Sequence, residues 1–110
     1  MNVRFRTRKL QRICNSQAEL KRHFGDMADV IMNRLQVLAM ANHLGQVPHT
    51  KPIRRHQLSG ARHGQFAVDL RHPYRLVFRP DHNPMPQKLD GGVDVNAVIA
   101  IEIIEIIDYH

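Results

Sequence analysis

The side chains best suited to chemistry stand in three short stretches of the second half of the sequence. His56 lies in R-R-H-Q-L-S-G, Arg75 lies in H-P-Y-R-L-V-F, and the sequence closes on Asp108, Tyr109 and His110. Together these residues supply two imidazoles, a guanidinium, a carboxylate and a phenol. Each stretch falls on an expected β-strand, and a small sheet can bring strand residues from distant parts of a chain to one face. We therefore expect these five residues to form a catalytic site.

This set of groups matches what cleavage of RNA without a metal ion requires. A base must take the proton from a ribose 2′-hydroxyl, and an acid must protonate the departing 5′-oxygen; histidine suits both tasks. A bidentate arginine can offset the charge of the phosphorane, and a tyrosine ring can stack on an unpaired base. The carboxylate of the final residue favours His110 as the acid, and the arginines around His56 favour His56 as the base. Asp108 is an alternative base.

Four other arginines are candidate contacts to RNA or to the ribosome: Arg54, Arg55, Arg62 and Arg79. Arg79 has the same strand parity as Arg75, so we expect both to point to the uncovered face of the sheet. One difficulty arises at His56. Simple alternation places it on the same face as the apolar Leu58, so we expect a twist or a bulge to turn one of the two.

The segment from Val98 to His110, V-I-A-I-E-I-I-E-I-I-D-Y-H, is the strand around which the fold is expected to form. Its β-branched residues favour an extended chain. Ile99, Ile101, Ile103 and Ile107 share one parity, and Val98, Ile104 and Ile106 share the other. Both faces are therefore expected to be covered, which places the strand inside the sheet rather than at its edge. Glu102 and Glu105 have opposite parity, which indicates a β-bulge between them.

The rest of the chain predicts helices followed by antiparallel strands. Apolar spacing predicts one or two helices from Thr7 to Gly25, with a capping box at Ser16-x-x-Glu19, and a further helix from an Asp26 cap to about His43. Strands are expected at Asn2–Arg6, Arg54–Ser59, Gln65–Leu70 and Tyr74–Arg79, with a Pro-bounded linker at Val47–Pro52, turns at Gly60–Gly64 and His72-Pro73, and a loop at Pro80–Gly92. This order predicts an α+β fold in which a helical hairpin packs on one face of a small antiparallel sheet, with the last strand central.

Composition limits the function classes. With 110 residues, we expect one domain covering residues 1–110. The formal charge of +6 favours RNA, the ribosome or an acidic protein as partner. The single cysteine, Cys14, excludes an internal disulfide, and its apolar helical spacing predicts a buried, unreactive thiol. No signal peptide or membrane-spanning segment is expected, and we expect the protein in the cytoplasm.

Two stretches resemble a known protein family. L-x-G-x-R-x-G-Q-F-x-V-D-L-x-H-P-Y-R-L-x-F, from Leu58 to Phe78, and the terminal I-I-E-I-I-D-Y-H are similar to the RelE/ParE superfamily of bacterial toxins, in its HigB-type ("plasmid maintenance killer") branch. The resemblance covers nearly the whole chain. Asp-Tyr-His at the end is its most specific part, and the H-x-L-x-G pattern around His56 is the next.

The resemblance implies a type II toxin that enters the ribosomal A site and cuts mRNA, without a cofactor. It also implies a cognate antitoxin, HigA-like with a helix-turn-helix. In the HigB-type branch the strand histidine and the terminal Asp-Tyr-His carry activity, and an arginine of the later strands matches Arg75. The lysine often found near the glycine after the histidine strand is missing here, because Ser59 precedes Gly60. Arg62 or Arg79 is a possible substitute for it.

Two other interpretations use the same scaffold: a ParE-like inhibitor of DNA gyrase without catalysis, and a basic binding protein without catalysis. The two histidines and the terminal Asp-Tyr-His favour the endonuclease, since a gyrase inhibitor needs no paired imidazoles. A metal site is not expected. His49, His56 and His63 recur every seven residues, but strands and turns give that spacing no common face.

Overall fold

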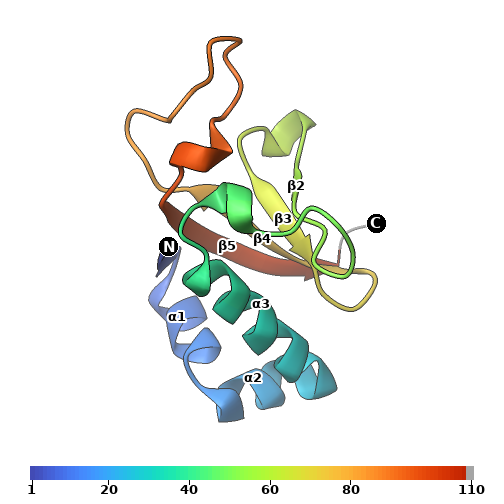
Figure 1. Ribbon diagram of the computed structural model, residues 1–110. Helices are drawn as coiled ribbons and strands as arrows, with labels where there is room; N and C mark the ends of the chain where they lie inside the picture. Colours follow the sequence, from blue (N-terminus) through green and yellow to red (C-terminus); the bar gives the residue numbers. More distant parts are fainter. Residues whose placement is uncertain (109–110) are drawn as a thin grey trace.

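The computed structural model describes residues 1–108, which form a five-stranded sheet with α-helices along one of its faces (Figure 1). The helices are α1 (Arg8–Cys14), α2 (Gln17–Phe24) and α3 (Ala28–Met40). The strands are β1 (Asn2–Phe5), β2 (His56–Gln57), β3 (Phe66–Asp69), β4 (Tyr74–Pro80) and β5 (Ala100–Asp108), in the spatial order β1-β5-β4-β3-β2. The predicted α+β fold, with the N-terminal helices on one side of the sheet, is confirmed.

Two side-chain caps, of which the sequence predicted the one at Ser16, divide the first helical region into two helices. Thr7 caps α1, and its hydroxyl oxygen accepts a hydrogen bond from the Leu10 amide at 3.1 Å. Ser16 caps α2 in the same way, accepting from the Glu19 amide at 3.2 Å. These bonds satisfy amides that the first turn of a helix leaves unpaired. Gly25 then ends α2 with φ at +59°, a conformation that costs glycine little.

The start and end of the long helix differ from the prediction. A 3₁₀ turn at Gly25–Met27 precedes α3, and Met27 occupies its N-cap without a side-chain hydrogen bond. Asp26 is therefore not the cap; its carboxylate pairs with Arg71 at 3.1 Å instead. The helix ends at Met40, because Ala41 turns to extended dihedrals before His43 is reached.

β5 lies between β1 and β4, so it is an interior strand as expected, but the central strand of the five is β4 and not the last strand. The sheet is not wholly antiparallel, however, because β1 runs parallel to β5 in the register Asn2–Ala100 to Phe5–Ile103. The sequence did not predict this parallel pairing, because turn residues indicate only which strands that follow one another along the chain will pair. The pair β1–β5 joins the first strand of the chain to the last.

The predicted bulge in β5 is present. Val77 lies opposite Glu105 and Phe78 lies opposite Ile103, so Ile104 is the additional residue. An extra residue reverses the side-chain alternation beyond it. As a result Ile106 packs with the main core, whereas Ile107 packs on the other face, the reverse of their predicted sides.

The main core lies between the helices and the sheet. Its fully buried side chains are Leu20, Ile31 and Leu38 from the helices and Val68, Leu76, Phe78, Ile101 and Ile103 from the strands, among others. A second, smaller cluster covers part of the opposite face and consists of Leu58, Ala67, Val77 and Ile104. We call this opposite side of the sheet the open face.

The small cluster resolves the difficulty at His56. His56 pairs with Ala67, a member of that cluster, and Leu58 belongs to the same cluster. Both residues therefore lie on the open face, and the expected twist or bulge between them was wrong. β2 is also shorter than the predicted Arg54–Ser59 strand and has two residues.

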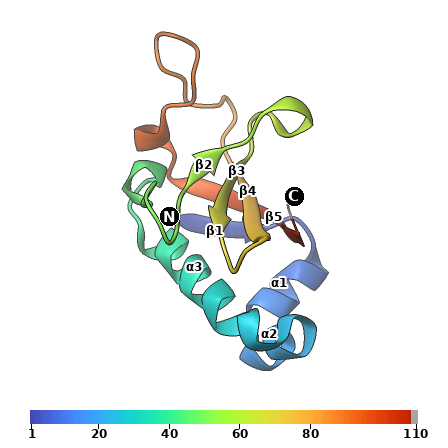
Figure 2. The same ribbon diagram turned by 90° about the vertical axis from the view of Figure 1, so that its right-hand side faces the viewer.

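The segment after β4 projects from the sheet as a long loop before the 3₁₀ turn at Val95–Ala97 (Figure 2).

None of the helices in residues 1–108 has the length and apolar character needed to cross a bilayer.

Cys14 is buried at the end of α1, as predicted, and burial raises the pKa of its thiol to about 11. At pH 8 a thiol with this pKa is ionised in only about one molecule in a thousand, and the thiolate is the reactive form. We expect an alkylating reagent to label the folded protein very slowly and the denatured protein rapidly. An Asn15→Cys variant in a Cys14→Ser background, with its thiol at the adjacent exposed position, is the matched control. Equal labelling rates for the two folded proteins would contradict this prediction.

Candidate active site on the open face

β2, β3 and β4 bring His56 and Arg75 to the same face. His56 lies opposite Ala67, and Arg75 lies opposite Asp69, two residues further along β3. Residues two apart on a strand share a face, so both positions belong to the open face. Two strand spacings, about 10 Å, separate β2 from β4.

The imidazole of His56 is held in one orientation by the backbone. Its Nδ1 lies 2.7 Å from the carbonyl oxygen of Arg54. A carbonyl oxygen can only accept, so Nδ1 carries the proton and donates it. In the neutral ring Nε2 then has a free lone pair. Nε2 is shielded from solvent and has no hydrogen-bond partner among residues 1–108. A buried polar atom without a hydrogen-bond partner lowers the stability of the fold, and such atoms often have a functional role.

Arg54 holds that carbonyl in place through an uncommon backbone conformation. Its φ is +49°, in the left-handed region that side chains rarely adopt. Such conformations persist where surrounding contacts fix them, and they concentrate at functional sites. Here the fixing contacts come from Asp69, whose two carboxylate oxygens accept from Arg54 Nε at 2.6 Å and from Nη2 at 3.0 Å. This paired bond raises the pKa of the Arg54 guanidinium.

Asp69 connects several parts of the site. Besides Arg54, its carboxylate lies 3.7 Å from Nε of Arg75, and its backbone carbonyl accepts from Nε of the buried Arg34 at 2.7 Å. Burial lowers the pKa of Arg34. The carboxylate therefore positions one arginine on each side of β3, and the carbonyl ties this end of the strand to α3.

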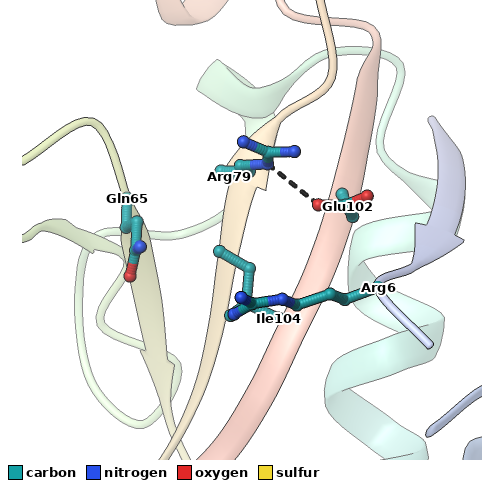
Figure 3. A pocket seen from close by; sticks show the side chains of 5 residues that line it. All are labelled: Arg6, Gln65, Arg79, Glu102 and Ile104. Atoms are coloured by element: carbon teal, nitrogen blue, oxygen red, sulfur yellow. Dashed lines mark hydrogen bonds and ion pairs between the residues drawn. The ribbon is translucent and has the colours of Figure 1, made fainter. Parts of the chain in front are cut away.

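The candidate RNA-binding arginines all have partners in the described structure. Arg62 pairs with Glu105 and donates to the Gln65 amide oxygen at 2.8 Å. Arg79 Nε donates to Glu102 at 2.9 Å, as Figure 3 shows. Arg55 donates to the carbonyl of Val47 at 3.1 Å, and burial lowers its pKa. An RNA phosphate at Arg54, Arg62 or Arg79 would therefore replace or share a carboxylate.

The end of β5 does not bring Asp108 to the open face, contrary to the prediction that it would join His56 and Arg75 there. Asp108 is exposed and pairs with Tyr74. Tyr74 shares its parity with the core residues Leu76 and Phe78, so this register position lies on the helix side of the sheet. Tyr109 and His110, the other two predicted catalytic residues, lie outside the described residues.

Sequence reasoning missed the carboxylates of the open face. Asp69 lies in the Leu58–Phe78 stretch that resembles the toxin family, but the sequence analysis assigned it no role. Glu102 and Glu105 were used only to predict the bulge, and their ion pairs with arginines were not predicted. The available signal was an acidic residue within a strand close to arginines of matching parity, such as Arg75 and Arg79. Cross-strand pairs of opposite charge on one face are a known stabilising arrangement.

Within residues 1–108, no three histidine, cysteine or acidic side chains come close enough together to hold a metal ion. No protein-family model matches the chain, and no curated protein matches it. Its membership of the RelE/ParE superfamily therefore stays a prediction from the sequence.

Proposed function

We propose that this protein is the toxin of a type II toxin–antitoxin system, of the HigB type within the RelE/ParE superfamily, and that it cuts mRNA on the ribosome in the cytoplasm. The observation that carries the proposal is the geometry of His56. Its imidazole is fixed through Nδ1, with the lone pair of Nε2 unused by any described residue, on the face that also holds Arg75. A base on this face needs that tautomer.

In the proposed reaction His56 Nε2 takes the proton of a ribose 2′-hydroxyl. The 2′-oxygen attacks the adjacent phosphorus, the bond to the 5′-oxygen breaks, and the products are a 2′,3′-cyclic phosphate and a free 5′-hydroxyl. Arg75 offsets the charge on the phosphorane, and Asp69 orients Arg75 from 3.7 Å. His110 protonates the leaving oxygen; this role, like those of Asp108 and Tyr109, rests on the sequence resemblance.

The proposed dependence on the ribosome follows from the shielding of His56. Because Nε2 is not exposed to solvent, the substrate strand has to be presented so that it opens the site. Alignment of two reacting groups can contribute on the order of 7–11 kcal/mol to a barrier. The ribosome is the proposed source of that alignment, since it holds the mRNA in a fixed path.

The proposed protein partner is a helix-turn-helix antitoxin with an acidic segment. The formal charge of +6 supports an acidic partner. Attraction between opposite charges weakens as salt is added. We therefore expect the affinity of toxin for antitoxin to fall with ionic strength.

The test compares purified protein on ribosome-bound mRNA and on the same RNA without ribosomes. We expect cleavage in the ribosome complex and little cleavage of the naked RNA. Efficient cutting of naked RNA would contradict the ribosome-dependent part of the proposal. Growth arrest in cells with intact mRNA and inhibited gyrase supercoiling would instead indicate the ParE-like function, and arrest with neither effect would indicate a non-catalytic binding protein.

A further inference from the structure

A groove crosses the open face away from His56. One hollow of about 240 Å³ is lined by Arg6, Gln65, Arg79, Glu102 and Ile104 (Figure 3). A second hollow, of about 450 Å³, shares Gln65 and Arg79 with the first and continues toward the loop after β4. We call the two hollows together the distal groove.

Arg6 brings an unused cation to this groove. It directly follows β1, and its side chain extends across β5 toward Ile104 in Figure 3; Arg6 and Arg79 line the same hollow. The Arg6 side chain is exposed and makes no hydrogen bond or ion pair with the described part of the chain. Its five N–H donors are therefore available to a ligand.

Arg79 is a second donor that a ligand can recruit at low cost. Its side chain is 57% exposed, whereas that of its partner Glu102 is 17% exposed. An ion pair with one partner this exposed contributes little to stability. An anion in the groove can therefore share the Arg79 guanidinium with Glu102 or replace that carboxylate.

Gln65 is oriented to donate into the same space. Its amide oxygen accepts from Arg62 Nη1 at 2.8 Å, which leaves the NH₂ group of Gln65 for a ligand in the groove. With two guanidiniums, one carboxylate and an amide donor, the first hollow has an excess of donors and one net positive charge.

We infer that the distal groove is a second phosphate-binding subsite for a single RNA strand, in which Arg6 is the main contact and Arg79 and Gln65 assist it. This inference rests on the proposed function, because the same strand would occupy both sites. Arg75 and Arg79 lie four residues apart on β4, on the same face, which corresponds to about 13 Å along the strand. A few nucleotides of extended RNA span that distance.

The geometry favours a phosphodiester over an acidic peptide. The floor of the groove is formed by strands that already pair on both sides, since β4 lies between β3 and β5. A peptide therefore finds no free strand edge there to extend the sheet. Guanidinium forks instead match the geometry of phosphate oxygens.

The test measures binding of uncleavable 2′-O-methyl RNA to the full chain by fluorescence anisotropy, with a dinucleotide and an octanucleotide. We expect the octanucleotide to bind more tightly, because it reaches from the His56 site to the distal groove. Arg6→Ala should weaken octanucleotide binding about tenfold, as expected for a lost charge-assisted hydrogen bond, and should leave dinucleotide binding unchanged. It should also reduce the slope of log affinity against log salt by about 0.7, the value for one phosphate contact on single-stranded nucleic acid.

Arg12→Ala is the matched control, because it removes the same charge from an exposed position on α1, where Arg12 pairs with Glu19 at 2.8 Å. Three results would overturn the inference. Arg6→Ala and Arg12→Ala could weaken octanucleotide binding equally, or Arg6→Ala could weaken the binding of both RNA lengths equally. The octanucleotide could also bind no more tightly than the dinucleotide. A glutamate-rich peptide that binds as tightly as the octanucleotide and depends equally on Arg6 would overturn it as well. The assay involves no cleavage, so it can succeed or fail independently of the catalytic proposal.

Discussion

Replacing His56 by glutamine is expected to lower the rate of mRNA cleavage on the ribosome by about 10²–10⁴-fold, the usual contribution of a general base. Glutamine keeps a side-chain N–H that can donate to the Arg54 carbonyl, so the local contact at 2.7 Å has a replacement. It does not supply a basic nitrogen, and the proton of the 2′-hydroxyl then has no acceptor. Single-turnover cleavage of ribosome-bound mRNA measures the change.

His49→Gln is the control for this substitution, because His49 is exposed in the segment before β2. Both variants should unfold at the same temperature as the native protein, since His56 is only half-buried and neither substitution removes a core side chain. An unchanged rate for His56→Gln would show that His56 is not the base.

Arg75→Ala is expected to reduce the rate by about 10²–10³-fold, as does removal of one donor that stabilises charge in a transition state. The binding of RNA should change much less, because the phosphorane carries more charge than the ground-state phosphodiester. Arg75→Lys keeps the charge but not the planar fork of donors, so we expect it to recover only part of the rate. The measurement is the rate at saturating protein, separated from affinity by varying the protein concentration.

The matched control is Arg71→Ala, which removes an exposed arginine from the turn before β4, where it pairs with Asp26. Its rate should equal that of the native protein. If Arg75→Ala weakens affinity without changing the saturated rate, Arg75 is a binding residue and not a stabiliser of the transition state. Asp69 retains its two bonds to Arg54 in this variant, so the site around His56 should stay intact.

Local signals predicted much of the fold. Ser16 and Glu19 marked the restart of the helix because a capping bond depends on residues three apart. The opposite parity of Glu102 and Glu105 marked the bulge, because side chains alternate along a strand. The parallel pairing of β1 with β5 was missed, since no local pattern records which distant strand will be the neighbour.

The candidate site was predicted less completely than the fold. His56 and Arg75 were proposed from the sequence. Strand alternation placed His56 on the same face as the apolar Leu58, which looked inconsistent because the sequence did not predict a second apolar cluster on the open face. The roles of Asp69 and Arg6 depend on contacts between residues far apart in the chain. Asp69 contacts Arg54, Arg75 and Arg34. The side chain of Arg6 extends over β5. The pattern of residues along a single strand predicts neither arrangement.

The chemistry of the cut bond tests the central claim most directly. Purified protein is added to ribosomes programmed with an mRNA whose A-site codon carries either 2′-hydroxyl or 2′-O-methyl groups at all positions. We predict cleavage of the unmodified mRNA to a 2′,3′-cyclic phosphate and no cleavage of the methylated codon, because the attacking oxygen is blocked. Equal cleavage of both mRNAs, or cleavage of neither, would contradict the account.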